Sequence, residues 1–380
     1  MKKNLLTIFI SVLLSLIFCY IGFFIHHFFK DHEKNTFLFK SIEQVNFNKF
    51  YSDKLHHLRG HLKIKESAKP ENYLFTIINN FKDNKKNILI QGDSWIEQLN
   101  ETENFNSFKE IYNFTNINNL GFINSGITSY SPSLMQIQLN ILEKDFNIKP
   151  NIVIAYIDQT DIGDELCRYK YNRKYDDDNN LISVINKNYS RNVFEYTRIN
   201  NISEIILLNN SKLLRTYHLT NFFIKYSYYR ALNKFIGIKK YGWKNRNIRK
   251  CHFSQITNYL NKIDNADLLY FEERIKDYLK VLLEKKHIDN IILITFPHYN
   301  HLYEQESNKK YNVNVSNIVD KFSQSYDKVY HLNFSDLIIN NKISFDSSAY
   351  KNDKSHLKER YYIKIFHIFN NISWLEQLKF

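Results

Sequence analysis

The stretch that decides the fold is NILIQGDSWIEQL, residues 87–99, in which an apolar run leads directly into Gly-Asp-Ser. A short aliphatic run that ends at a turn signal is typical of a buried strand. The stretch therefore predicts a strand that presents Ser94 next to Asp93, in a turn that leads into a helix. Ser94 is then either a nucleophile or the N-cap of that helix, because a Gly-Asp-Ser turn suits both roles.

The same alternation of strand and helix recurs along the chain. Strands are predicted at 87–91, 119–126, 151–158, 290–298 and 328–334, and helices at 131–147, 267–287, 313–325 and from about 356. Strands separated by helices pair in parallel, with helices on both faces of the sheet. We therefore expect a three-layer α/β/α fold with a mainly parallel, flavodoxin-like sheet.

An apolar segment precedes this domain. Residues 5–25 carry no charge and are long enough to span a bilayer, and Lys2 and Lys3 stand before them. The positive-inside rule then keeps the N-terminus in the cytoplasm. The alternative is a cleaved signal peptide, but no small-x-small cleavage site follows. We expect a signal anchor over 1–30, which places a single-pass protein in the cell membrane with its domain in the periplasm or outside the cell.

The rest of the chain divides into a short leader and one large domain. Residues 31–84 are polar and aromatic without a clean period and are interpreted as a juxtamembrane segment, and the domain is expected at 85–380. Residues 166–266 break the alternation and are rich in Tyr, Asn, Arg and Lys. This stretch predicts an insertion that serves as a lid or as the surface for an envelope-assembly partner.

The formal net charge of +13 suits nucleic acid, an anionic membrane or an acidic polysaccharide. The basic residues look dispersed, and no zinc-finger spacing, basic zipper or RNA-binding aromatic signature organises them. We therefore expect no nucleic-acid partner. Of the three cysteines, Cys19 lies in the apolar segment, so Cys167 and Cys251 either form a disulfide in an oxidising compartment or remain reduced.

A possible partner for Ser94 lies near the end of the chain, in DKSH, residues 353–356. The three-residue spacing lets Asp353 accept a hydrogen bond from one nitrogen of the His356 imidazole, while the other nitrogen faces Ser94. The acid would fix the tautomer, and the neutral imidazole would take the serine proton. An Asp-x-x-His pair also occurs as a capping or surface arrangement.

Gly-Asp-Ser near the start of an α/β domain and Asp-x-x-His near its end resemble the SGNH (GDSL-like) hydrolase family, over about residues 85–375 without the insertion. In that family four short blocks carry the serine, a glycine, an asparagine and the Asp/His pair. The resemblance implies a catalytic triad of Ser94, His356 and Asp353. It also implies that Gly126, in NSGITSYS, is a backbone oxyanion donor.

The third block departs from the family pattern. Family members usually have Gly-x-Asn-Asp after the third strand, whereas this chain has DQTDIGDE, with Thr160 at the asparagine position. The implied oxyanion hole therefore consists of Ser94, Gly126 and Thr160, and Gln159 is a second side chain able to donate there.

The remaining polar clusters do not predict a metal site or a cofactor. The spacing of Asp158, Asp161, Asp164 and Glu165 does not match a calcium loop, which favours a solvated loop or a hydrogen-bonded turn. In FPHYNHL, His298 and His301 are candidate ligands or substrate contacts, but a zinc site needs a third ligand.

These features predict a membrane-anchored serine esterase or O-acyltransferase that acts on acyl esters, with a cell-envelope glycan as the substrate suggested by family analogy. The alternative is a non-catalytic glycan-binding or envelope-assembly protein on the same fold. The altered third block and the aromatic insertion favour this alternative, while the order of serine, acid and histidine argues against it.

Overall fold

The computed structural model describes the parts of the chain that form the sheet, its main helices and four of the predicted site residues, Ser94, Gly126, Thr160 and His356. These are residues 10–12, 14–15, 22, 39, 41–55, 57–59, 69–79, 86–100, 109, 112–113, 115–184, 201–232, 263–296, 314–334 and 356–358.

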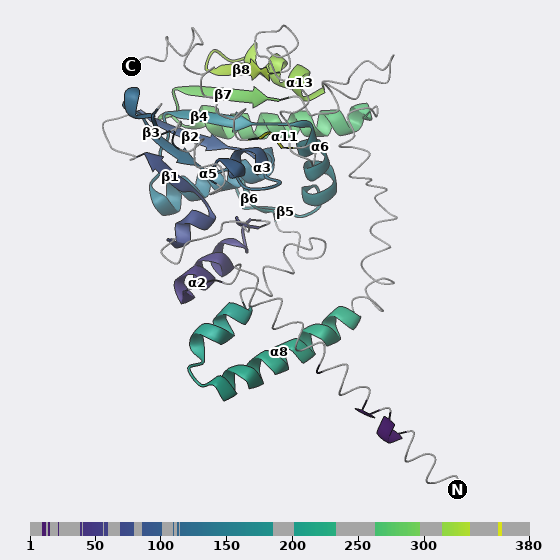
Figure 1. Ribbon diagram of the computed structural model, residues 1–380. Helices are drawn as coiled ribbons and strands as arrows, with labels where there is room; N and C mark the ends of the chain where they lie inside the picture. The colour runs from purple at the N-terminus through teal and green to yellow at the C-terminus, as the bar shows by residue number, and fades with distance from the viewer. Residues whose placement is uncertain are drawn as a thin grey trace.

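A six-stranded sheet forms the centre of the protein (Figure 1). Its strands are β1(Thr76–Asn79), β2(Asn87–Gln91), β3(Gly121–Asn124), β4(Ile152–Tyr156), β7(Asn290–Thr295) and β8(Val329–Asn333). They lie in the order β1-β3-β2-β4-β7-β8, and all neighbours are parallel except β1 and β3. The five parallel strands thus follow the 2-1-3-4-5 order of flavodoxin-like sheets, which confirms the predicted mainly parallel α/β fold.

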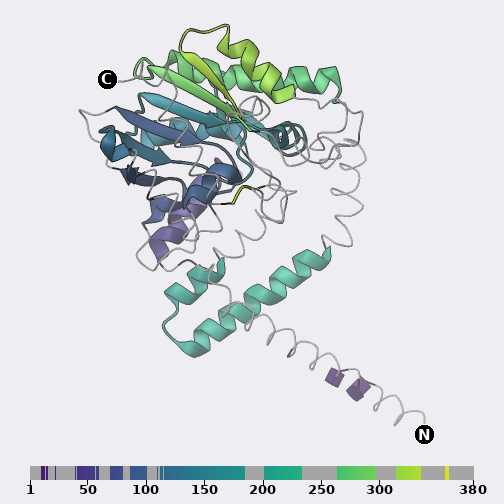
Figure 2. The same ribbon diagram turned by 45° about the horizontal axis from the view of Figure 1, so that its top comes forward.

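Three helices cover one face of the sheet. They are α5(Pro132–Phe146), α11(Asn265–Glu284) and α13(Asn314–Ser323), and α11 contacts both of the others (Figure 2). The sheet row Leu89, Val153 and Ile291 packs into the same core as these helices. The three helices match those predicted at 131–147, 267–287 and 313–325.

The opposite face of the sheet is buried as well. The next row, Ile90, Ile154 and Ile292, is at most 4% exposed although it points away from the helices. Strands that are buried on both faces fit a three-layer fold. A helix is expected from about residue 356, but the described residues end at 358. The second outer layer of helices therefore stays a prediction.

Residues before 85 also contribute to the sheet domain. This part contains α2(Ile42–Tyr51), the 3-10 helix η1(Pro70–Tyr73) and strand β1, which pairs with β3. Arg59 is fully buried and donates to the carbonyls of Asn72, Asn124 and Gly126. Burial lowers the pKa of Arg59 to about 10. The segment that the sequence suggested to be juxtamembrane therefore clamps the end of β3.

The predicted insertion begins close to the sheet. After β4 come α6(Gln159–Gly163), the π-helix η4(Asp164–Tyr169) and a two-stranded hairpin of β5(Arg173–Tyr175) and β6(Leu181–Val184). Strand β6 contacts α5. Farther along the insertion, α8(Lys212–Leu232) lies apart from the sheet in both views (Figures 1 and 2).

The apolar N-terminal segment is described only at residues 10–12, 14–15 and 22. Among the described residues, we find no helix that is both long and apolar enough to cross a membrane. The signal anchor over 1–30 stays a prediction.

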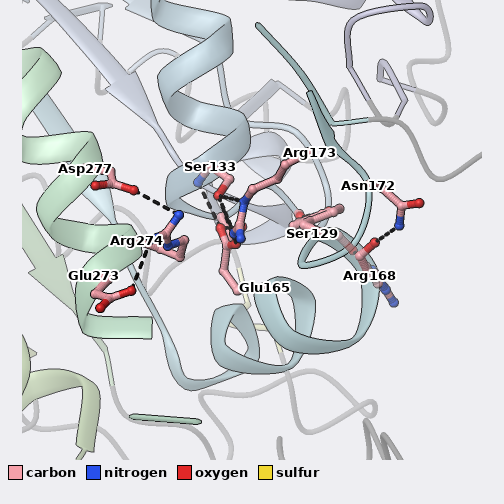
Figure 3. A network of polar contacts seen from close by, with 11 residues as sticks. Ser129, Ser133, Glu165, Arg168, Asn172, Arg173, Glu273, Arg274 and Asp277 are labelled. Carbon is pink, nitrogen blue, oxygen red and sulfur yellow. Dashed lines mark hydrogen bonds and ion pairs between the residues drawn. The ribbon is translucent and has the colours of Figure 1, made fainter. Parts of the chain in front are cut away.

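A buried acid joins the start of the insertion to the start of α5 (Figure 3). Glu165 in η4 is fully buried and accepts hydrogen bonds from the hydroxyl of Ser131 and from the N–H and hydroxyl of Ser133, each of the latter two at 2.9 Å. It also pairs with Arg173, whose side chain is 5% exposed. Ser131 stands at the N-cap position of α5 but makes no side-chain cap bond, because its hydroxyl donates to Glu165.

We expect Glu165→Gln to lower the free energy of unfolding by about 3 kcal/mol, because it leaves the Arg173 guanidinium buried without a counter-charge. Glu273→Gln is the matched control, since Glu273 pairs with Arg274 but its side chain is 66% exposed. A surface pair of this kind contributes less than about 1 kcal/mol. Urea unfolding of the full-length chain in detergent measures both, and equal losses would contradict the assignment.

Candidate active site

Ser94 stands at the point where β2 ends and the short helix α3(Ser94–Glu97) begins, followed by the 3-10 helix η2(Gln98–Asn100). Gly92 makes the turn with a φ of +155°, and a Cβ there would lie 2.7 Å from Cγ1 of Ile96 and 2.9 Å from Cβ of Tyr156. Only glycine allows this approach between α3 and the end of β4.

Asp93, and not Ser94, caps helix α3. Its Oδ1 accepts the backbone N–H of Trp95 at 2.8 Å, and its backbone is extended. The role that the sequence left open for the serine is therefore filled by the preceding acid. The Ser94 hydroxyl remains available for other contacts.

That hydroxyl meets the predicted histidine. Nε2 of His356 lies 2.9 Å from Oγ of Ser94, across a separation of 262 residues, and both side chains are partly exposed. The adjacent Leu357 is fully buried and fixes the chain at this point. The structure thus brings together two of the three predicted triad residues. Asp353 lies outside the described residues, so its role stays a prediction.

The contact lies at a place where open α/β sheets bind ligands. The chain passes from β2 to β3 on one side and then returns to β4 on the other, so the strand order reverses between β2 and β4. Ligands bind at the carboxyl ends of the strands beside such a reversal. Ser94 follows β2 and Thr160 follows β4, so both flank this position.

A second hydrogen-bonded chain of acid, histidine and hydroxyl side chains shows that a catalytic hydroxyl must also be exposed to solvent. His331 contacts Asp320 through Nδ1 and lies 2.7 Å from the Thr295 hydroxyl through Nε2. Thr295 is only 2% exposed and also contacts Ser316. A buried hydroxyl cannot reach a substrate, so this chain is structural, whereas Ser94 is open to solvent.

The predicted oxyanion donor Gly126 is held tightly against α3. A Cβ at Gly126 would lie 2.5 Å from the backbone nitrogen of Glu97, so the position requires glycine. Its N–H, however, donates to Oδ1 of Asn124 at 2.8 Å. The family role implied for this N–H would require Asn124 to give way.

Thr160, the other predicted donor, is hydrogen-bonded to the acid that caps α6. Both its N–H and its hydroxyl lie 2.6 Å from Oδ1 of Asp158, the N-cap of α6. The neighbouring Gln159 is 4% exposed, and its Nε2 has no hydrogen-bond partner among the described residues. Sequence comparison put Thr160 first and Gln159 second as the oxyanion donor. A motif does not reveal that the Thr160 hydroxyl is already hydrogen-bonded to Asp158.

The acids after β4 form a buried cluster with Asp93. Asp158, Asp161, Asp164 and Glu165 are at most 3% exposed, so the expectation of a solvated loop was wrong. The alternative of a hydrogen-bonded turn is confirmed, since Asp158 and Asp161 form a capping box. Carboxylate oxygens of Asp93, Asp158 and Asp161 lie within 4.8 Å of one another, an arrangement that could also hold a metal ion.

The electrostatics of this cluster favour protonated acids. Burial, together with the charge of Asp158, raises the pKa values of Asp93 and Asp161 well above the ordinary range. Burial also raises the pKa of Asp164 to about 7, although Arg168 at 2.8 Å acts in the opposite direction. Protons on these carboxyls avoid the cost of several buried negative charges.

An aromatic row packs around Trp95 of α3. Trp95 is 2% exposed and stacks on Tyr156 with ring centroids 5.3 Å apart, and it also contacts Phe296 at 4.8 Å. Phe296 in turn contacts Phe334. The row joins the ends of β2, β4, β7 and β8. Trp95 thus fixes α3 and, through it, the position of Ser94.

Arg59 and Asn124 are site residues that sequence reasoning missed. Arg59 donates to the carbonyl of Gly126 at 3.0 Å, and the Asn124 amide donates to the carbonyl of Ile96 at 2.9 Å. A lone arginine in a polar segment gives no sequence signal for such a role. The asparagine directly before Ser-Gly was visible, but its bond to α3 depends on the fold.

Three other predicted residues fall outside the described part of the chain: His298, His301 and Cys251. Cys167 is disulfide-bonded. Its pairing with Cys251 stays a prediction.

The buried acidic cluster makes stability depend on pH. Because the folded carboxyls hold protons at pH values where unfolded ones have lost them, the free energy of unfolding should fall as pH rises from about 4 to about 7. Each such proton contributes about 1.4 kcal/mol per pH unit in that window. Asp161→Asn removes one of these acids and should flatten the slope. Urea unfolding at several pH values measures it, and an unchanged slope would contradict the protonated cluster.

Comparisons with known proteins find no family model and no curated protein that matches the chain. Among solved structures, a protein from Streptococcus pneumoniae provisionally described as a platelet activating factor is 11% identical with a TM-score of 0.38, covering 87% of this chain and 92% of that one. A mutant acetyl-xylooligosaccharide esterase from a Geobacillus species is 11% identical with a TM-score of 0.38, covering 75% of this chain and 92% of that one. A gut microbial diltiazem-metabolizing enzyme is 12% identical with a TM-score of 0.34, covering 77% and 47%.

The Geobacillus protein is described as an esterase. The fold rests on the sheet topology, and the site rests on its own geometry.

Proposed function

We propose that this chain is a serine carboxylic ester hydrolase or O-acyltransferase of the SGNH type. The observation that carries the proposal is the contact of 2.9 Å between Oγ of Ser94 and Nε2 of His356 at the carboxyl end of the parallel sheet. The bond joins a serine to a general base at the edge of the sheet where ligands bind.

In the proposed mechanism His356 takes the Ser94 proton on Nε2 while Oγ attacks the carbonyl carbon of an acyl ester. The tetrahedral intermediate collapses, and the alcohol leaves with the proton from His356. Water or an acceptor hydroxyl then gives its proton to His356 and attacks the acyl-enzyme. The second tetrahedral intermediate releases the acid or the transferred ester, and His356 returns the proton to Oγ of Ser94. Asp353 would orient the imidazole.

The proposed oxyanion hole differs from the family pattern. Within the described residues, the backbone N–H of Ser94 makes no hydrogen bond, and Gln159 offers an amide donor after β4. The Thr160 hydroxyl is used by Asp158. We assign oxyanion stabilisation to Ser94 N–H and Gln159, with Gly126 contributing only if Asn124 moves.

The proposal also covers the cellular location of the protein and its substrate. The charge-free run 5–25 supports a membrane anchor with the domain in the periplasm or outside the cell, and that location makes an envelope glycan ester the proposed substrate. Residues 166–266 remain the proposed partner surface.

A second candidate function is non-catalytic binding of an acylated glycan. The observation that favours it is the hydrogen bonding of both family oxyanion donors, Gly126 to Asn124 and Thr160 to Asp158. Such a protein would bind its ligand without turnover.

We expect Ser94→Ala and His356→Ala each to lower the rate of acetyl ester hydrolysis by roughly 10³-fold or more, and the double variant to be hardly slower, because the two groups act as one unit. Thr295→Val is the matched control, since it removes the hydroxyl from the buried Asp320–His331 chain and should leave the rate unchanged. Turnover of 4-nitrophenyl acetate by the full-length chain measures these rates. Near-wild-type turnover in Ser94→Ala would refute the mechanism, and no turnover by the wild type on any acyl ester would favour the binding function.

The oxyanion assignment has its own test. Gln159→Leu should lower kcat by about 10²-fold with little change in KM, since the amide is proposed to bind charge that develops in the transition state. Thr160→Val should reduce stability by about 1 kcal/mol through the lost hydrogen bond from its hydroxyl to Asp158 and leave kcat nearly unchanged. The reverse ranking in kcat would restore Thr160 as the donor.

A further inference from the structure

The positive charge of the chain is concentrated in one segment, contrary to the dispersed pattern inferred above. Between Glu204 and Asp264 the sequence has twelve Lys and Arg and no Asp or Glu, against a net charge of +13 for the whole chain. The same segment is rich in aromatic residues. A long segment of one sign attracts an anionic partner.

Helix α8 lies within this segment and exposes an apolar stripe. Leu213, Tyr217 and Ile224 are 80%, 63% and 61% exposed. Spacings of four and seven residues place them on one face of the helix. Leu219, which points away from that face, is 5% exposed, so the helix buries one side and presents the stripe on the other.

Lys225 lies beside the stripe. It is exposed and stands about 100° around the helix from the centre of the line through Leu213, Tyr217 and Ile224. Arg215 lies on the opposite side, with the buried Leu219, and donates to the carbonyl of Asn209. The helix contains no acidic residue. An apolar face on a basic helix is the pattern of a helix that lies in the plane of a membrane surface.

The position of α8 agrees with such a surface. In both views α8 lies apart from the sheet, on the side of the molecule where the described residues 10–15 lie (Figures 1 and 2). Those residues belong to the apolar run 5–25, which is proposed to enter the bilayer. An anionic glycan or nucleic acid would satisfy the basic residues but would leave the apolar stripe in water.

We propose that α8 binds the surface of an anionic lipid bilayer. Leu213, Tyr217 and Ile224 enter the boundary between headgroups and acyl chains, and Lys225 beside them contacts lipid phosphates. The helix then holds the sheet domain against the membrane. This proposal does not depend on the chemistry of Ser94.

The test is hydrogen–deuterium exchange of the full-length chain in nanodiscs of phosphatidylcholine alone or with one quarter phosphatidylglycerol. We expect exchange of the α8 peptides to be at least fivefold slower with phosphatidylglycerol. The variant Leu213→Ser, Tyr217→Ser, Ile224→Ser should lose this difference. The control variant Ile117→Ser, Leu269→Ser changes exposed apolar residues elsewhere and should retain it.

Equal exchange of the wild-type α8 peptides in the two kinds of nanodisc would overturn the proposal. So would equal slowing by dextran sulfate, added to nanodiscs of phosphatidylcholine alone, because a soluble polyanion would then be sufficient. Exchange in the sheet peptides reports whether each variant is folded. Ester turnover, measured in parallel, separates a failure of this proposal from a failure of the proposed function.

Discussion

The site depends on the hydrogen bond from the Trp95 N–H to Asp93, which caps α3 and so leaves the Ser94 hydroxyl for His356. Gly92 allows this turn, because any larger residue would meet Ile96 and Tyr156. The stacking of Trp95 on Tyr156 then fixes the helix over the end of β4. One turn after one strand therefore sets the direction of the serine.

Burying the carboxyl group of Asp93 costs free energy, which the surrounding structure offsets. Asp93 lies beside Asp158 and Asp161, and burial is the main cause that raises the pKa values of Asp93 and Asp161. Protonation removes buried negative charge, and the backbone hydrogen bonds of the α3 cap and the α6 capping box stabilise the carboxyl groups. The cluster thus joins the ends of β2 and β4, the two strands between which the strand order reverses, and it holds the two sides of the site together.

Much of this arrangement could be predicted from the sequence, because it depends on local patterns. Aliphatic runs gave the parallel strands, helical spacing gave α5, α11 and α13, and the order of the motifs placed Ser94 and His356 in one site. Features that depend on contacts between distant segments could not be predicted. Arg59 donates to the end of β3 from a segment whose sequence has no clear periodicity. The Thr160 hydroxyl donates to Asp158, and a comparison of motifs, which considers each position separately, does not reveal such a hydrogen bond. Burial of the acidic turn also depends on the fold, which brings Asp93 after β2 beside Asp158 and Asp161 after β4.

The central claim is that Ser94 is a nucleophile activated by His356. The most direct measurement is mass-spectrometric peptide mapping of the full-length chain after reaction with a fluorophosphonate, which phosphonylates only an activated serine. The account predicts one adduct, on the peptide containing Ser94, which is lost in His356→Ala. An unmodified Ser94 in folded wild-type protein, or an adduct on another residue, would contradict it.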